Sequence, residues 1–313
     1  MHFKKALITG GNGNLGRLLA NSLRATGVAT VQFDIPGSEP ENPADEERIV
    51  IGDVRDQKLI SETFDKHQPD AVFHLASLLS GSSEANPDDA WEINATSSYQ
   101  LLKRSVDAKV KCFFFASTLA TYGAGVTDPL PEQEQQWPDL FYGVTKVAVE
   151  RLGVYYKLKH GLDFRCLRFP LVLSPFAPPG ALTAYPSHAM KSACDGGNSF
   201  TFPVSGHIGT STLFLDDVIQ SIVSLAKADP ARFTQHVYSL HSFVLTGEMI
   251  EQEIKKRYPA FKIDYDPQPA AEHMLGGLPD IVEDQAARAD WDWQPQYDFD
   301  RTVSAMFELF SSK

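Results

Sequence analysis

The 313-residue sequence predicts an α/β fold in which a doubly wound parallel β-sheet carries helices on both faces and a smaller second lobe follows. Two observations predict this class. Short β-branched or aromatic segments alternate with amphipathic stretches through the first 175 residues, which is typical of strand–helix–strand units. After Leu173 the chain enters SPFAPPGALTAYP, whose proline, glycine and small residues indicate a loop or lid rather than a core element.

Six strands are expected in the first part, at residues 5–9, 30–34, 48–52, 71–75, 111–116 and 164–169. Helices should lie between them. The helix expected at 17–26 follows a glycine cluster, and the two longest are expected at 88–107 and 140–160, the second with apolar residues at helical spacing. Beyond residue 175, strands at 199–202 and 237–240 interleave with helices near 216–228 and 246–258.

Composition limits the possible partners. A net charge of −12 disfavours nucleic acid, whose binding needs a basic surface, and favours a small-molecule substrate. The apolar run at the N-terminus stops at a glycine cluster and is too short for a signal peptide or a membrane span, so we expect no membrane partner and a cytoplasmic location. The three cysteines lie far apart without metal-ligand spacing, so neither disulfides nor a metal site is expected.

The segment Thr9-Gly-Gly-Asn-Gly-Asn-Leu-Gly16 follows the first strand directly and opens a helix. Gly10 permits a tight turn, Gly13 lets the backbone approach a pyrophosphate, and Gly16 lets helix and strand pack closely. Asn14 and Leu15 lie at the start of that helix, whose N-terminus attracts anions. This pattern predicts a Rossmann dinucleotide site, and the alternative, a generic glycine turn, is disfavoured by the strand before it and the acid after it.

That acid is Asp34, which ends the second strand about 20 residues beyond the glycines, where a carboxylate accepts bonds from the adenosine ribose. It would repel a 2′-phosphate, and the next residues supply no arginine. The sequence therefore predicts NAD rather than NADP. Asp53 and Val54 follow the third strand and are expected near the adenine, although Asp53 could equally be a solvated acid at a strand end.

Tyr142 and Lys146 are four residues apart on a predicted helix and therefore share one face. A lysine ammonium beside a phenol favours the phenolate, which can then act as a general base. Ser117 and Thr118 place hydroxyls where the fifth strand ends, at the edge where ligands bind. Asn94 lies inside an apolar run, where an amide needs a partner, so it is either part of the catalytic set or a satisfied core asparagine.

With these residues the chain resembles the extended short-chain dehydrogenases/reductases, the superfamily of nucleotide-sugar epimerases and dehydratases, over nearly its whole length. The resemblance is carried by TGGNGNLG, Asp34, GDV, HLA at 74–76, Asn94, STLATYG, YGVTK and LRFP. Within the superfamily, the segments 74–94, 247–267 and 283–300 resemble the short-chain type of L-threonine 3-dehydrogenase.

The resemblance implies roles for individual residues. Thr118 would be the catalytic hydroxyl with Asn94 beside it, Tyr142 the base, and Lys146 its activator and a ligand of the cofactor. Leu75, Ala76 and Phe169 would also contact NAD, whereas Ser80, Ser117, Thr118 and Thr183 would contact substrate. The resemblance further implies a homodimer formed through the two long helices, with Phe141, Leu152 and Tyr156 as apolar candidates for its contact. Residues 1–175 would be the NAD-binding Rossmann domain and 176–313 mainly a discontinuous substrate lobe, with some segments returning to the sheet.

The sequence departs from the threonine dehydrogenase pattern around the substrate. The loop Gly180-Ala181-Leu182-Thr183-Ala184 lacks the acid that would answer a substrate ammonium, and a tryptophan and a basic residue are replaced by Leu278 and Gly209. We therefore expect an NAD-dependent dehydrogenase for a secondary alcohol of a small hydroxy or amino-hydroxy acid or polyol, with threonine a poor substrate. One alternative is a nucleotide-sugar epimerase or dehydratase. The other is a protein that binds NAD without turnover, and the intact Thr118, Tyr142 and Lys146 disfavour this second alternative.

Overall fold

The computed structural model describes residues 2–37, 48–177 and 182–311. Its largest element there is a sheet of seven parallel strands in the order β10-β6-β5-β4-β1-β2-β3. These are β1 (Lys5–Thr9), β2 (Ala29–Asp34), β3 (Ile49–Ile51), β4 (Ala71–His74), β5 (Cys112–Thr118), β6 (Phe164–Phe169) and β10 (Tyr238–Ser239). The strand order reverses direction between β1 and β4, which confirms the predicted doubly wound Rossmann sheet.

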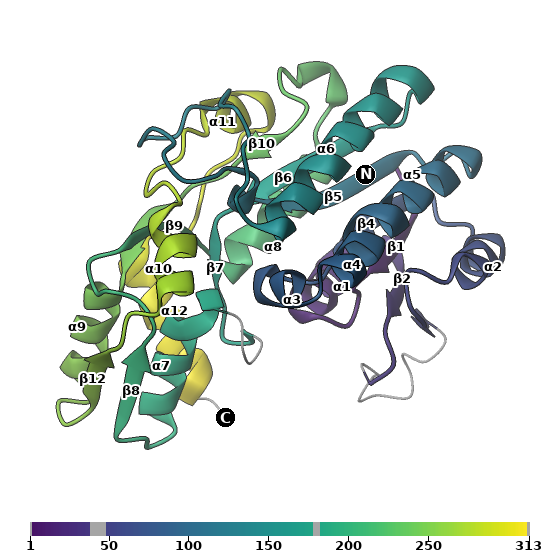
Figure 1. The fold of residues 1–313 in the computed structure, drawn as a ribbon. Coiled ribbons are helices and arrows are strands. Elements are labelled where there is room, and N and C mark those ends of the chain that lie inside the picture. Colours follow the sequence, from purple (N-terminus) through teal and green to yellow (C-terminus); the bar gives the residue numbers. More distant parts are fainter. Residues whose placement is uncertain (1, 38–47, 178–181, 312–313) are drawn as a thin grey trace.

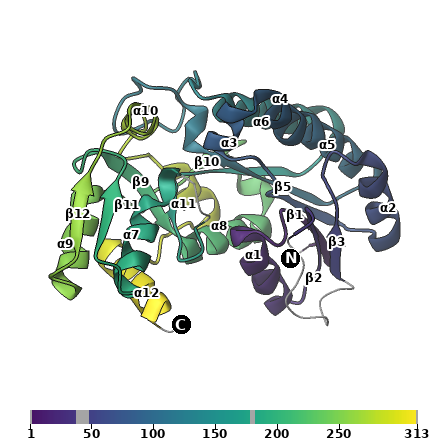
Figure 2. The same ribbon diagram turned by 60° about the horizontal axis from the view of Figure 1, so that its bottom comes forward.

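Helices cover both faces of this sheet (Figure 2). One face carries α1 (Asn14–Ala25) and α8 (Leu215–Lys227), and the other carries α2 (Gln57–His67), α5 (Ser97–Asp107) and α6 (Phe141–His160). Each face forms its own apolar core, with Leu19 and Ile222 fully buried on the first side and Phe113 on the second. Burying one such side chain contributes about 1.5–3 kcal/mol, so these cores stabilise the packing of the helices on both faces of the sheet.

After β6 the chain builds a smaller lobe (Figure 1). It contains a three-stranded sheet in the order β11-β9-β7 and a parallel pair β12-β8. Their bounds are β7 (Leu171–Leu173), β8 (Ser199–Phe202), β9 (Gly209–Phe214), β11 (Phe243–Thr246) and β12 (Lys262–Tyr265). The helices α7 (Tyr185–Cys194), α9 (Gly247–Arg257), α10 (Pro269–Gly276) and α12 (Phe299–Ser311) surround them, and Phe202, Phe214 and Met306 are buried at the centre.

Three segments beyond residue 175 belong to the larger body. Helix α8 packs against α1, strand β10 pairs with β6, and α11 (Gln285–Trp291) packs against β10. Trp291 joins the same apolar core as Leu19 of α1. The chain therefore crosses between the two bodies several times.

The helix expected at 88–107 is present, but its middle is π-helical. After α3 (Ser80–Ala85), the chain forms α4 (Pro87–Ala90), a π-helical segment at Trp91–Thr96 and then α5. Period alone could not reveal this change, because the apolar spacing stays close to helical through it. Likewise α1 begins at Asn14 rather than residue 17, so Leu15 and Gly16 lie inside its first turn.

Candidate active site

The glycine loop between β1 and α1 is shaped by contacts that admit no side chain. Gly10 has a φ of +67°, and a Cβ there would lie 2.8 Å from the backbone nitrogen of Ala76. A Cβ on Gly16 would lie 2.1 Å from the oxygen of Gly10. Gly13 caps α1 without a side-chain hydrogen bond, and no acidic residue occupies the first turn. The first N–H groups of α1 are therefore available to an anion such as a pyrophosphate.

Asp34, the last residue of β2, lies against this loop. One carboxylate oxygen accepts from the backbone nitrogen of Asn12 at 2.7 Å, and the other accepts from that of Ile35 at 2.8 Å. A carboxylate has about four acceptor positions, so two remain for another donor. Asp34 therefore fixes the loop and can still accept bonds from a ribose.

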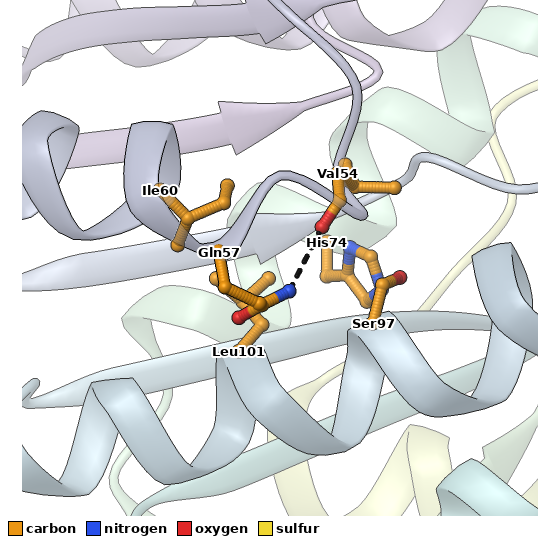
Figure 3. Close-up of a pocket in the computed structure, with 6 residues that line it drawn as sticks. All are labelled: Val54, Gln57, Ile60, His74, Ser97 and Leu101. Atoms are coloured by element: carbon orange, nitrogen blue, oxygen red, sulfur yellow. Dashed lines mark hydrogen bonds between the residues drawn. The ribbon is translucent and has the colours of Figure 1, made fainter.

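The turn after β3 presents Val54 rather than a free acid. The carboxylate of Asp53 is held by the guanidinium of Arg55 at 2.7 Å, and the hydrogen bond from Arg55 holds the pKa of Asp53 below its usual value despite partial burial. Val54 is nearly buried and lines a small recess with Ile60, Ser97 and other residues shown in Figure 3. The side-chain amide of Gln57 donates to the Val54 carbonyl at 3.2 Å, so this turn is anchored to α2.

His74, at the end of β4, links the glycine loop to the segment beside it. Its Nδ1 lies 2.6 Å from the Thr9 hydroxyl and its Nε2 lies 2.7 Å from the Ser98 hydroxyl. Ser98 in turn donates to the carbonyl of Asn94 at 2.5 Å, which leaves its oxygen to accept from His74. Complete burial lowers the pKa of His74 to about 3, so it is a neutral imidazole with the proton on Nε2.

Two further hydrogen bonds to Thr9 hold the loop after β4 in place. The backbone nitrogen of Leu75 donates to the Thr9 carbonyl at 3.1 Å, and that of Ala76 donates to the Thr9 hydroxyl at 3.4 Å. Leu75 and Ala76 are thereby held beside Gly10.

Asn94 lies in the π-helical segment and is 2% exposed. Its Oδ1 accepts from the backbone nitrogen of Leu78 at 2.8 Å, while its Nδ2 donates to the Leu78 carbonyl and to the Thr145 hydroxyl. π-Helical turns often occur at functional sites. Here the amide fixes the loop after β4 against α6 and its hydrogen bonds are satisfied. A place for Asn94 in the catalytic set stays a prediction.

Tyr142 and Lys146 lie one turn apart at the start of α6. The ammonium of Lys146 donates to the carbonyl of Ala116 at 2.9 Å and lies 4.7 Å from the ring centre of Phe115 and 5.4 Å from that of Tyr142. Burial lowers the pKa of Lys146 to about 8, so it remains largely protonated at neutral pH. The shared face predicted for the two side chains is therefore present.

The expected effect of Lys146 on the phenol is absent from this structure. Burial raises the pKa of Tyr142 above its usual value, and only the nearby Ser77 hydroxyl acts in the other direction. The Lys146 ammonium donates instead to the Ala116 carbonyl.

Thr118 and Ser117 end β5 on opposite faces, as alternate residues of a strand do. Thr118 is half-buried, and its hydroxyl accepts from the backbone nitrogen of Ala120 at 3.1 Å. Ser117 is 4% exposed and donates to the carboxylate of Glu150 at 2.5 Å. The expectation that Ser117 contacts substrate is therefore wrong in this structure, since its hydroxyl points into the protein behind the site.

The remaining expected residues lie at the rim or in the core. Ser80 opens α3, which packs against α6, and Thr183 lies in a short 3₁₀ turn, Leu182–Ala184, that packs against β7. Both are half-buried, whereas Gly180 and Ala181 lie outside the described residues. Phe169 is 5% exposed and belongs to the core shared with α1 and α8, so its side chain is structural rather than open to a cofactor.

The structure also shows site residues that sequence patterns missed. The Ser174 hydroxyl, after β7, donates to Oδ1 of Asn14 at 3.1 Å and so joins the smaller lobe to the first turn of α1. Glu150, on the buried face of α6, binds Ser117 of β5 and Arg168 of β6. Its position four residues after Lys146 was the available signal, because it puts an acid on the buried face of the helix.

The uncapped glycine loop, the strand-ending acid and the Tyr–Lys pair beyond the carboxyl ends of a doubly wound sheet define a dinucleotide-dependent enzyme. More particularly, the chain belongs to the NAD dependent epimerase/dehydratase family, whose sequence model matches residues 6–240. This membership confirms the predicted NAD-dependent enzyme of the extended short-chain dehydrogenase/reductase type. A helix long and apolar enough to cross a membrane does not occur in the described part of the chain.

Similar proteins cover the chain from end to end. An uncharacterized epimerase/dehydratase of Staphylococcus saprophyticus is 30% identical over 99% of this chain and 98% of its own length. The structure of L-threonine dehydrogenase from Clostridium difficile is 30% identical with a TM-score of 0.91, covering 100% and 99% of the two chains. That of L-threonine dehydrogenase from Phytophthora infestans is 29% identical with a TM-score of 0.90, covering 99% of each. The similarity therefore includes the smaller lobe as well as the sheet.

Proposed function

We propose that this protein is an NAD-dependent dehydrogenase that oxidises a secondary alcohol of a small hydroxy or amino-hydroxy acid or polyol. The observation that carries the proposal is the Tyr142–Lys146 pair on one face of α6, whose ammonium bonds to the Ala116 carbonyl two residues before Thr118 on β5. Full-length similarity to threonine dehydrogenase structures supports a small substrate, because the lobe that would hold it is included in the match.

The residues of the glycine loop fit the pyrophosphate of NAD. Gly10, Gly13 and Gly16 leave no side chain between the backbone and the anion, and the N–H groups from Asn14 and Leu15 onward begin an uncapped helix. Asp34 would bind the adenosine ribose through its remaining acceptor positions. In the proposed site Val54, Leu75 and Ala76 would line the adenine side, and Asp53 would contribute through its backbone because Arg55 holds its carboxylate.

In the proposed mechanism Tyr142 takes the proton of the substrate hydroxyl. Its phenolate needs nearby positive charge because burial favours the neutral phenol, and Lys146 is the protonated side chain on the same helix face. Thr118 would orient the substrate oxygen. NAD, when bound, supplies the hydride acceptor. Lys146 loses its charge as the pH rises through about 8, so this support weakens in alkaline solution.

The substrate pocket is proposed to include Ser80 and Thr183, whose hydroxyls suit a polyol or hydroxy acid. Ala184 is 4% exposed and offers no carboxylate to an ammonium. An unpaired buried charge costs several kcal/mol, so we expect a compact hydroxylated acid without an amine to be oxidised faster than L-threonine. A kcat/KM for threonine near 10⁴ M⁻¹s⁻¹, roughly the ordinary enzyme range, would contradict this part of the proposal.

The test is a spectrophotometric screen for NADH formation over hydroxy acids, amino-hydroxy acids, polyols and UDP-sugars. We expect stoichiometric NADH and a ketone product with one of the first three classes. Conversion of a UDP-sugar without net NADH would instead support the second candidate, a nucleotide-sugar epimerase or dehydratase. The family model and the Staphylococcus relatives favour that candidate by name.

We also propose a homodimer formed through α5 and α6. Trp91, Tyr99, Val144 and Tyr155 are 38–51% exposed on these helices and the π-helical segment before them. The contact does not use Tyr156, which is 7% exposed and lies in the core, and Leu152 packs against the same core. Light scattering at micromolar concentration tests this, and the change Tyr155→Glu should shift a dimer towards monomer. One similar L-threonine 3-dehydrogenase is described as monomeric. A monomer mass for this protein would contradict the proposed dimer.

A cytoplasmic location completes the proposal. All three cysteines are free thiols, and two of them are buried, which suits a reducing compartment. Fractionation of the producing cells would test it.

A further inference from the structure

A buried ion pair lies behind α6, one helical turn from Lys146. Glu150 is fully buried and Arg168 is 6% exposed. Nε of Arg168 donates to one carboxylate oxygen at 2.9 Å, and a terminal nitrogen donates to the other at 2.6 Å. Apolar residues of the same volume often stabilise a core as well as a buried pair does, so stability alone does not account for it.

The carboxylate connects three segments around the site. Oε1 also accepts from Ser117, which directly precedes Thr118, and Oε2 accepts from the side chain of Gln136 at 3.0 Å. Gln136 lies in the segment that leads into α6. One carboxylate therefore holds the end of β5, strand β6 and the approach to Tyr142 at fixed distances from one another.

Arg168 extends the cluster. Its second terminal nitrogen donates to the Tyr122 hydroxyl at 2.7 Å, and its guanidinium carbon lies 5.3 Å from the centre of that ring. Tyr122 follows the short turn that Thr118 caps. Both ends of the Thr118 turn are thus tied to the same ion pair.

Glu150 also faces Lys146, since the two are four residues apart and both are buried. The other titratable groups facing Lys146 are Tyr142 on α6, the Cys166 thiol on β6 and His74 on β4. Burial keeps these three neutral near pH 7, because it raises the pKa of Tyr142 and Cys166 and lowers that of His74. Glu150 therefore carries the negative charge that favours the Lys146 ammonium.

We propose that Glu150 is a positioning residue of the proton-transfer site: it fixes Thr118 and the start of α6 through Ser117, Gln136 and Arg168, and it keeps Lys146 protonated. The inference rests on the proposed function, because it assigns Glu150 to the reaction of Tyr142. It differs from the family motifs in the sequence, since among the described residues the Glu150 carboxylate bonds to Ser117, Gln136 and Arg168 rather than to the glycine loop or Tyr142.

The test compares full-length variants by two measurements. The titration midpoint of Lys146 is followed through its ¹³Cε NMR signal, assigned with Lys146→Met, and turnover is measured on the substrate found in the screen. In Glu150→Gln the amide can still accept from Ser117, but the negative charge is gone. We expect the Lys146 midpoint to fall by about one pH unit and kcat to fall roughly tenfold or more, with NAD affinity nearly unchanged.

Two variants separate charge from structure. Glu150→Asp keeps the charge but shortens its reach, so kcat should fall while the Lys146 midpoint stays near that of the unmodified protein. Asp163→Asn is the matched control, because Asp163 pairs with the buried Arg165 at the opposite end of β6 at 2.6 Å. It should lower the unfolding temperature without moving the Lys146 midpoint or kcat.

If Glu150→Gln does not fold, Ser117→Ala tests the positioning role, with Ser105→Ala as its control. Ser105 is another buried serine, and its hydroxyl donates to the Leu101 carbonyl within α5. We expect a severalfold loss of kcat for the first and none for the second. An unchanged Lys146 midpoint in Glu150→Gln, or equal turnover of the two serine variants, would overturn the proposal. The Lys146 titration needs no substrate, so it decides the charge role even if the dehydrogenase assignment fails.

Discussion

The two edges of the seven-stranded sheet use polar side chains for different ends. At the amino edge Asp70 accepts from the backbone nitrogens of Lys4 and Lys5 and pairs with Lys111 at 3.1 Å. Arg165 binds Asp163 and the carbonyls of Leu225 and Ala228 there. These bonds tie strand starts to one another, and this edge serves stability.

At the carboxyl edge the polar groups are held in place but keep hydrogen-bonding positions for a ligand. The N–H groups at the start of α1 have no side-chain cap, Asp34 retains acceptor positions, and Thr118 can donate its hydroxyl proton. Buried side chains behind these groups, such as His74 and Glu150, hold them in place through hydrogen bonds. The amino edge thus satisfies its polar groups among themselves, whereas the carboxyl edge keeps some of them for a ligand.

At the carboxyl edge, the largest expected loss of activity is at Tyr142. Tyr142→Phe keeps the ring but removes the proton acceptor, so kcat should fall by about 10²–10⁴-fold while NAD affinity stays within twofold, roughly. Steady-state kinetics and calorimetric titration with NAD measure the two quantities. Retention of most activity would show that Tyr142 is not the base, and equal loss of NAD binding would show that the ring mainly supports the cofactor.

The next effect concerns pH and His74. Its folded pKa of about 3 lies below the unfolded value of 6.5, so the unfolded state binds the extra proton first and stability falls as the pH drops below 6.5. Between pH 7 and pH 5 this group should remove about 2 kcal/mol from the free energy of unfolding. Urea unfolding at several pH values should show a shallower slope for His74→Gln. Identical slopes would mean that His74 titrates with the same pKa in the folded and the unfolded protein.

Asp34 should give a smaller effect. Asp34→Asn removes the negative charge that would repel a 2′-phosphate and weakens the bond to Asn12. We expect NAD to bind about tenfold more weakly, equivalent to about 1.4 kcal/mol, and the preference for NAD over NADP to narrow. The unmodified protein is the reference in a fluorescence titration. If it binds NADP as well as NAD, the role of Asp34 in cofactor choice is refuted.

The smallest effect is expected at the amino edge, at Asp70. Burial raises its pKa, but the bonds from Lys5, Lys4 and Lys111 outweigh this and leave it below the usual value. Its contribution is therefore present above about pH 4 and is lost as the pH falls through the lower folded value. Asp70→Asn should cost about 1 kcal/mol at pH 7, and the difference from the unmodified protein should shrink below pH 4. Activity per folded molecule should not change; a lowered kcat would blur the distinction between the two edges.

The parallel sheet and the location of the cofactor loop could be predicted from the sequence alone. β1 and β6 occur at the predicted residues, and the glycines of 10–16 form the loop they predict, because both follow from local constraints on backbone space and strand period. Tyr142 and Lys146 share a face because four residues make about one helical turn. These relations are short-range and can be read along the chain.

Which polar groups face the site depends on contacts between segments that are distant in the sequence. Ser117 was a plausible site residue in sequence, yet its contact with Glu150 turns it into a support. The pKa of Tyr142 moves opposite to the expected direction because burial of the phenol, a product of packing, outweighs its hydrogen bond with Ser77. The local sequence pattern predicts the helix or strand on which a side chain lies. Its hydrogen-bonding partners come from distant segments, which only the assembled fold brings together.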